Sequence, residues 1–311
     1  MTLFEMIKTR PYEMQQEFSC GVRKQNENEV LVSVWRPKAK KCQLAVIAEG
    51  KRKLFPMYPA KICGMEDYFT VVLQAENLAD RLQGMPYFFV ADGETFCDSY
   101  ARMITGREYF GRRQGKVRAC FDFQDFDWTG ENRTYIPLKQ MIVYQCHVRG
   151  FTKHESSKVK HPGTFSGVTE KIPYLKELGI NTLFMMPVYD FNEQMTDETG
   201  SLLNKINYWG YTRDAFYFSP KASYGSGNKP VVTEFKEMVC SLHSQGMNFI
   251  LDMYFEGKSP EFITRCLRYY AQEYHVDGFH VTSDKMDLEW LRQDPVLAYC
   301  KIFGDGYQAD S

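Results

Sequence analysis

The sequence predicts a multidomain protein in which an all-β N-terminal part is followed by a parallel α/β part. Two observations predict this fold class. In the first third of the chain, short alternating apolar runs are separated by turn-prone stretches, and no convincing helix pattern interrupts them. From residue 141 onward, apolar strands alternate with amphipathic helices, which is the pattern of βα units around a parallel sheet. Apolar residues make up 44% of the 311 residues, which suffices for a substantial core.

The N-terminal part is predicted to be a small β-sandwich of the immunoglobulin-like kind. The stretch EVLVSVWRPKAKKCQLAVI holds two alternating runs joined by the turn-prone RPKAKK. MEDYFTVVL and MPYFFVADGETFCDS add further strands, and ADGET is typical of a hairpin turn. We assign residues 1–108 to this sandwich and residues 109–140 to a polar and aromatic connector.

The α/β part, residues 141–311, is predicted to contain five strands that alternate with four helices. Thr233 is expected to open the second helix, and Ser259 is expected to cap the third, with Pro260 at its first position. The predicted elements, in chain order, are the strand MIVYQCHV, the helix GVTEKIPYLKELGI, the strand NTLFMMPV, the helix TEFKEMVCSLHSQGM, the strand NFILDMYF, the helix SPEFITRCLRYYAQEYH, the strand VDGFHV, the helix DLEWLRQDP and the strand YCKIFGD.

Composition excludes several classes of function. A net charge of -1 implies no basic face, so nucleic acid is not an expected partner. The nine cysteines are scattered and never form CxxC, which favours reduced thiols over a disulfide framework or a metal site. No cofactor is predicted. No signal-like apolar segment opens the chain and no window approaches the ~18 apolar residues of a membrane helix, so we expect a cytoplasmic protein without membrane contact.

Polar residues follow the predicted strand VDGFHV at alternate positions. His280, Thr282 and Asp284 would share one face if the strand continues. The end of a buried strand is where an α/β barrel keeps its chemistry. The residue at the central position is nevertheless a threonine, which raises the question whether this stretch is an active site.

Several long stretches resemble a known family. VYQCHVRGFT, GTFSGVTEKIPYLKELGINTLFMMPV, NYWGYTRDAFYFSP, EFKEMVCSLHSQGMNFILDMYF and LRYYAQEYHVDGF resemble the catalytic barrel of the α-amylase superfamily, glycoside hydrolase family 13, in its pullulanase, isoamylase and glycogen-debranching branch. VWRPKAKKCQL and YFFVADGETFCDSYAR resemble the carbohydrate-binding-module-48-like domain that precedes such barrels. The resemblance implies an incomplete (β/α)8 TIM-type barrel of about five βα units, without the family's domain B after the third strand and without strands six to eight.

The resemblance also implies that the family's reaction machinery is degenerate. Family members cleave α-glucosidic bonds with retention, which needs two carboxyl groups about 5 Å apart. The nucleophilic aspartate of the family matches Thr282, its arginine matches His280, and its acid matches Asp305. A threonine hydroxyl without a general base is a poor nucleophile at neutral pH. The third carboxylate belongs to the seventh strand, which the sequence does not reach.

The third strand departs from the family in a similar way. Asp252 matches the family's aspartate, but Glu256 and Gly257 stand where the family has asparagine and histidine. Asp284 lies two residues beyond Thr282, about 6.6 Å along a strand, which is too far to replace the nucleophile.

The substrate-binding residues that the resemblance implies are Tyr211, Trp209, Asp252 and His280. In the stretch NYWGY, Tyr211 would pack beneath a sugar ring, whereas core packing is an equal alternative for Trp209. Asp252 could instead be satisfied by nearby backbone, and His280 could be a buried histidine. Two further residues are expected to be structural rather than functional: Trp35 in the sandwich core rather than on glucan, and His147 on the first strand of the barrel.

Three hypotheses follow. The first is a catalytically silent relative of glucan-debranching enzymes that binds α-glucan weakly. The second is an active hydrolase or transferase whose barrel is completed by further sequence. The third is a carbohydrate-binding or scaffold protein that acts through its N-terminal sandwich. A barrel of only five strands would leave an open sheet edge, which favours self-association or a partner that covers it.

Overall fold

A computed structural model describes residues 2–12, 20–62, 65–112, 115–196, 199 and 201–304. The chain divides into two compact units, one formed by residues 1–106 and 114–125 and the other by residues 107–113 and 126–311. The predicted connector, residues 109–140, is therefore shared between the two units.

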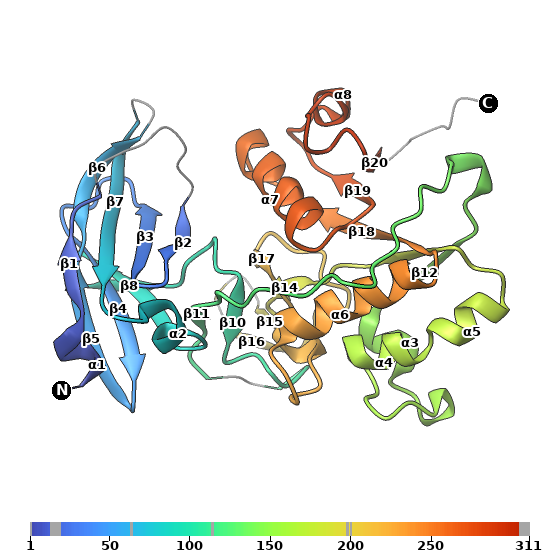
Figure 1. Ribbon diagram of the computed structural model, residues 1–311, viewed down its shortest axis with the longest axis horizontal. Helices are drawn as coiled ribbons and strands as arrows, with labels where there is room; N and C mark the ends of the chain where they lie inside the picture. Colours follow the sequence, from blue (N-terminus) through green and yellow to red (C-terminus); the bar gives the residue numbers. More distant parts are fainter. Residues whose placement is uncertain are drawn as a thin grey trace. The chain divides into compact units, whose positions relative to one another are not determined.

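The first unit contains two antiparallel sheets (Figure 1). One sheet has the order β1 (Lys8–Arg10), β7 (Met65–Gln74), β3 (Glu29–Trp35), β2 (Gly21–Asn26), and β6 (Tyr58–Ile62) also pairs with β7. The other has the order β10 (Met103–Thr105), β11 (Arg118–Cys120), β8 (Pro86–Ala91), β4 (Cys42–Ala48), β5 (Lys51–Pro56), and β9 (Glu94–Phe96) also pairs with β8. Two short helices, α1 (Leu3–Met6) and α2 (Leu78–Leu82), accompany the sheets.

Local predictions for the first unit have mixed outcomes. The hairpin turn in ADGET is confirmed between β8 and β9, with positive φ at Asp92 (47°) and Gly93 (91°), as a tight two-residue turn requires. The expectation that no helix interrupts the strands is wrong, since α2 buries Leu78 and Leu82. The expectation that Trp35 lies in the core is also wrong. Trp35 is the last residue of β3 and is 52% exposed.

The second unit contains a five-stranded sheet in which every pair is parallel, as predicted (Figure 1). Its order is β12 (Val143–Cys146), β13 (Thr182–Met185), β18 (Asn248–Tyr254), β19 (Gly278–Thr282), β20 (Lys301–Gly304). The helices are α3 (Val148–Thr152), α4 (Phe165–Glu170), α5 (Ile172–Glu177), α6 (Val231–Ser244), α7 (Pro260–Glu273) and α8 (Leu288–Arg292), with short 3-10 turns at Leu138–Gln140, Glu155–Ser157 and Ala222–Tyr224. None of the helices in the described ranges is long and apolar enough to cross a membrane.

The helix boundaries differ from prediction where proline occurs. The helix predicted over 167–180 is two helices, because Pro173 lacks an N–H group and fits only near a helix start, so a new helix begins at Ile172. Helix α6 begins at Val231 directly after Pro230, two residues before the predicted start. Helix α7 begins as predicted, and the Oγ atom of Ser259 accepts a hydrogen bond from the N–H of Phe262 at 3.3 Å.

A long excursion, residues 186–230, separates β13 from α6. It contains the antiparallel pair β14 (Tyr189–Phe191) and β17 (Ala215–Pro220), and the antiparallel pair β15 (Gln194–Thr196) and β16 (Leu202–Ile206). A buried ion pair inside the excursion joins Lys221 and Glu193 at 2.7 Å, and a second buried ion pair joins its Asp190 to Arg107 at 2.8 Å. By contrast, only residues 255–259 connect β18 to α7.

A buried charge cluster fastens the segment 126–135 to the amino-terminal side of the parallel sheet. His243 is fully buried, and its Nδ1 and Nε2 atoms lie 2.6 Å and 2.8 Å from the carboxylates of Glu131 and Asp277. Glu131 also contacts His275 at 2.7 Å, and Arg133 contacts Asp277 at 3.1 Å. Burial is the largest influence on Asp277 and opposes its ionisation, but the contact with His243, the N–H of Phe249 and the charge of Arg133 together outweigh burial and lower the pKa of this carboxyl.

Candidate functional site

The candidate site begins at the carboxyl ends of β18 and β19. The parallel register places Asp252 opposite His280 and Tyr254 opposite Thr282. Because side chains alternate along a strand, these four residues share one face of the sheet. The intervening apolar residues Leu251, Met253, Phe279 and Val281 are buried on the opposite face.

Asp252 is the centre of this arrangement. It is only 5% exposed, and its two oxygens have different side-chain partners. The Oδ1 atom lies 3.0 Å from Nδ1 of His280, and the Oδ2 atom accepts a hydrogen bond from the hydroxyl of Tyr211 at 2.5 Å. The structure thus brings together three of the predicted substrate-binding residues, and it satisfies Asp252 through side chains rather than through backbone. His280 is half-buried.

Thr282 is the last residue of β19, and its carbonyl oxygen accepts a hydrogen bond from the N–H of Phe255 at 2.8 Å. The strand does not continue to Asp284. That residue is exposed, and its Oδ1 atom accepts the N–H of Gly257 at 2.9 Å, which lowers the pKa of its carboxyl. Asp284 therefore does not share the strand face of Thr282. Asp305, the predicted acid, lies outside the described residues.

Glu256 has two side-chain partners that were not predicted from the sequence. Its carboxylate contacts the guanidinium of Arg213 and the hydroxyl of Tyr254. Tyr254 could have been found from the sequence, because it follows Asp252 at the alternate position of the same strand. No sequence signal indicates Arg213, which comes from the excursion.

The aromatic platform, which we define as Tyr208, Trp209 and Tyr211, lies in the loop between β16 and β17. Trp209 is 52% exposed and Tyr211 is 39% exposed, so core packing of Trp209 is not observed. Gly210 has a φ of +87°, and a Cβ atom there would lie 2.5 Å from the ring of Phe191. Only glycine fits this position, and the close approach holds the two flanking aromatic rings outward.

His147 lies next to the platform and is 5% exposed. Its Nε2 atom is 2.9 Å from the carbonyl oxygen of Tyr208, and its Nδ1 atom accepts the N–H of Gly150 at the start of α3. Burial lowers the pKa of His147 to about 4, so the ring is neutral at ordinary pH. These contacts agree with a structural role for this residue.

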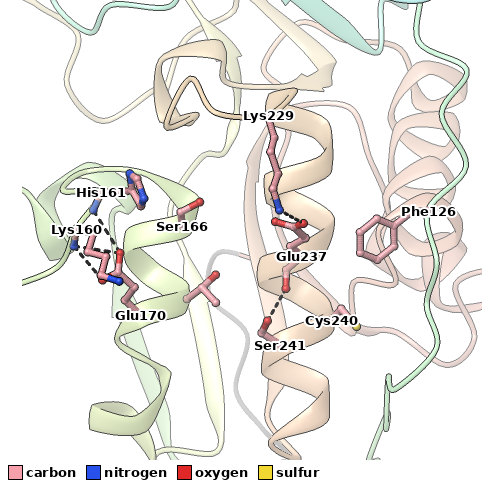
Figure 2. A pocket seen from close by; sticks show the side chains of 10 residues that line it. Phe126, Lys160, His161, Ser166, Glu170, Lys229, Glu237, Cys240 and Ser241 are labelled. Carbon is pink, nitrogen blue, oxygen red and sulfur yellow. Dashed lines mark hydrogen bonds and ion pairs between the residues drawn. The ribbon is translucent and has the colours of Figure 1, made fainter.

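Two cavities lined by described residues of the second unit are relevant to the site. One, of about 510 Å³, is lined by the platform, by Asn207 and by residues of β15 and β16. The other, of about 500 Å³, lies between α4 and α6 (Figure 2). Figure 2 shows that polar groups around this second cavity bind one another: Lys229 pairs with Glu237 at 2.5 Å, and Glu170 accepts the N–H groups of Lys160 and His161. The first cavity is therefore the better candidate for a sugar.

The residues in the described ranges contain no cluster of histidine, cysteine and carboxylate side chains that could hold a metal ion. The site is built from one buried carboxylate, an imidazole and exposed aromatic faces. Such an arrangement can bind a polyhydroxylated ring through hydrogen bonds at its edges and apolar contact on its faces.

Comparison with known proteins agrees with this architecture. Residues 107–293 match the family model described as alpha amylase, catalytic domain. The chain is 33% identical to isoamylase 1 of Arabidopsis thaliana over 243 residues, covering 58% of this chain and 31% of that protein. It is 34% identical to isoamylase 1 of Oryza sativa over 273 residues, covering 68% of this chain and 33% of that protein. The chain therefore spans about a third of the length of these curated relatives.

A solved structure has a similar fold. A pullulanase from Paenibacillus barengoltzii, solved in complex with maltotetraose, superimposes with a TM-score of 0.72 at 20% identity, covering 96% of this chain and 54% of that one. This likeness shows the fold of an amylase-type (β/α)8 catalytic region accompanied by β-rich parts. Since the family match covers more than half of the chain, the chain belongs to the alpha-amylase catalytic-domain family.

Proposed function

We propose that this chain is a glucan-debranching-type member of the alpha-amylase family that binds α-glucan at the carboxyl ends of β18 and β19 without cleaving it. The observation that carries the proposal is the residue at the end of β19. Thr282 stands there, beside Asp252 and His280, where retaining cleavage would need a second carboxylate.

Binding is supported by the exposed aromatic faces. Trp209 and Tyr211 present apolar surface beside a cavity of about 510 Å³, and the hydroxyl of Tyr211 connects this cavity to Asp252, which in turn contacts His280. A cavity of this size suits a short oligosaccharide. The pullulanase relative that was solved with maltotetraose makes a linear α-glucan the first ligand to test.

The absence of cleavage is supported by the contacts that the nearby carboxylates already make with other side chains. Asp252 is engaged by Tyr211 and His280, and Glu256 is engaged by Arg213 and Tyr254. A group that replaced the nucleophile would need sub-ångström placement at the anomeric carbon. Loss of one member of a catalytic group that acts as a unit costs many orders of magnitude in rate.

The test is an assay of reducing sugar released from pullulan, glycogen and maltodextrins, with the Thr282→Ala variant as the matched control. The wild-type protein is expected to release no more sugar than the variant. Calorimetry with maltotetraose is expected to show binding that Tyr211→Ala abolishes. Sugar release above the Thr282→Ala level would instead support the alternative of an active hydrolase or transferase.

A second candidate function rests on Trp35. We propose that the first unit is an immunoglobulin-like, carbohydrate-binding-module-like domain, and its exposed Trp35 offers an aromatic face that glucan could contact. Under this alternative, Trp35→Ala would abolish retardation in glycogen-containing native gels, whereas Tyr211→Ala would not. We also propose that the protein is cytoplasmic and that it self-associates over an open edge of the parallel sheet.

A further inference from the structure

The hydrogen bonds around His147 fix which ring nitrogen carries the proton. The Nδ1 atom accepts the N–H of Gly150 at 3.0 Å, so this nitrogen is unprotonated. The hydrogen of the neutral ring therefore sits on Nε2, which donates to the carbonyl oxygen of Tyr208 at 2.9 Å. The ring of His147 also stacks on the ring of Tyr208, with centroids 4.5 Å apart and an interplanar angle of 21°.

The neighbours of His147 stabilise the neutral ring with its hydrogen on Nε2. The hydroxyl of Tyr224 lies 2.9 Å from the same Nε2 atom, and the ring of Phe110 packs edge-on at 6.4 Å. Two cations, Lys221 and Arg149, disfavour a further positive charge on the ring. A neutral imidazole with one donor and one acceptor thus links the start of α3 to the backbone of the platform.

Bonds of the platform to other elements include that from the hydroxyl of Tyr211 to Asp252 of β18, and further bonds stay within the excursion. The N–H of Asn207 donates to the carbonyl of Glu193, and the hydroxyl of Tyr189 donates to the carbonyl of Gly210. These bonds shape the loop but do not fix it to the end of the first barrel strand. His147 follows β12 directly, and its contact with Tyr208 spans 61 positions in the sequence.

We propose that His147 is a positioning residue that holds the platform in the orientation needed to bind α-glucan. This inference rests on the proposed glucan-binding function. Tyr211 is held by its own bond to Asp252, whereas His147 acts through the carbonyl of Tyr208 and sets where the face of Trp209 lies relative to Tyr211.

Two conservative variants separate this role from a merely structural one. The amide of glutamine reaches the place of Nε2, so His147→Gln keeps a donor for Tyr208 and loses the acceptor for Gly150. Asparagine reaches only the place of Nδ1, so His147→Asn keeps the acceptor at the start of α3 and loses the donor. Asparagine is a preferred N-cap residue, so His147→Asn is expected to fold.

Calorimetry of the full chain with maltotetraose gives the first readout. His147→Asn is expected to bind about threefold to tenfold more weakly than the wild type, the effect of losing one buried hydrogen bond, and His147→Gln is expected to bind nearly as well as the wild type. If capping of α3 were the role of His147, the order of the two variants would be reversed. The reversed order, or equal affinities, would overturn the proposal.

Amide hydrogen exchange without ligand gives a second readout, independent of glucan binding. Faster exchange over residues 206–212 is expected in His147→Asn and not in His147→Gln, with the exchange of β18 unchanged in both. If the wild type binds no maltotetraose, the proposed function fails, and this exchange pattern still decides whether His147 positions the platform. Tyr208→Leu removes the stacked ring and is expected to loosen the same residues; unchanged exchange in both it and His147→Asn would overturn the positioning role.

Discussion

Asp252 joins three parts of the second unit through two oxygen atoms. It belongs to β18, its Oδ1 atom faces His280 of β19, and its Oδ2 atom accepts from Tyr211 of the excursion. A buried carboxylate that loses a partner retains the cost of its desolvation. The hydrogen bonds of Asp252 therefore order the site before any sugar binds.

At the residue scale, the first unit contains a buried carboxylate whose titration can be tested. Asp98 is 1% exposed, and it accepts hydrogen bonds from the hydroxyl of Tyr87 at 2.7 Å and from the N–H of Tyr100 at 2.9 Å. Burial raises the pKa of Asp98 from 3.8 to about 6. The folded chain therefore holds a proton that the unfolded chain releases between about pH 4 and pH 6.

The stability of the first unit is accordingly expected to fall as pH rises through that window, by on the order of 2–3 kcal/mol, because the unfolded state binds fewer protons there. Asp98→Asn is nearly isosteric and cannot titrate, so its stability should lack this contribution. Urea unfolding between pH 4 and pH 7 measures the difference. An equal pH dependence in the variant would contradict the account.

At the element scale, the loop between β16 and β17 depends on one glycine. Gly210→Ala would place a Cβ atom 2.5 Å from the ring of Phe191 and would strain a φ of +87°. We expect this variant to lose binding of maltotetraose, measured by calorimetry, because the platform must move. Gly227→Ala is the matched control, since Gly227 has a φ of +83° but no atom within 4 Å of the added Cβ. Equal affinities of the two variants would show that the close approach is irrelevant.

The buried charge cluster at the amino-terminal side of the parallel sheet gives a second prediction at this scale. Asp277→Asn leaves the Nε2 atom of buried His243 and the guanidinium of Arg133 without their anionic partner. Breaking a buried pair in this way costs about 3 kcal/mol or more, so the urea midpoint of the second unit is expected to fall markedly. Glu289→Gln, at an exposed ion pair with Arg292, is the control and should change little. Similar midpoints in both variants would contradict the role of the cluster.

The elements themselves were largely predictable from sequence, whereas their long-range contacts were not. Alternation and helical periodicity predicted the five parallel strands and the start of α7 at Pro260. The family resemblance, and not the spacing, implied that Asp252 and His280 belong to one substrate-binding site. The contact of Arg213 with Glu256 and the exposure of Trp35 were not predictable, because they depend on where distant segments pack.

At the scale of the whole molecule, both units present exposed tryptophans in the described residues: Trp35 in the first unit, and Trp209 and Trp290 in the second. Trp209 adjoins a cavity together with a second exposed aromatic ring, that of Tyr211. We therefore expect Trp209→Ala to weaken maltotetraose binding by about tenfold or more and Trp35→Ala to leave it unchanged, since stacking on one aromatic ring contributes more than one kcal/mol when it is desolvated. Calorimetry of the full-length variants measures both, and the opposite ranking would place glucan binding in the first unit.

The most direct test of binding without cleavage is a proton NMR experiment on a maltooligosaccharide that carries one α-1,6 branch. A single sample reports both binding, as saturation transfer from protein to sugar, and cleavage, as new anomeric signals from reducing ends. The account predicts saturation transfer that Tyr211→Ala removes, and anomeric signals that grow no faster than with Thr282→Ala. New reducing ends that form faster with the wild-type protein, or a lack of saturation transfer, would contradict it.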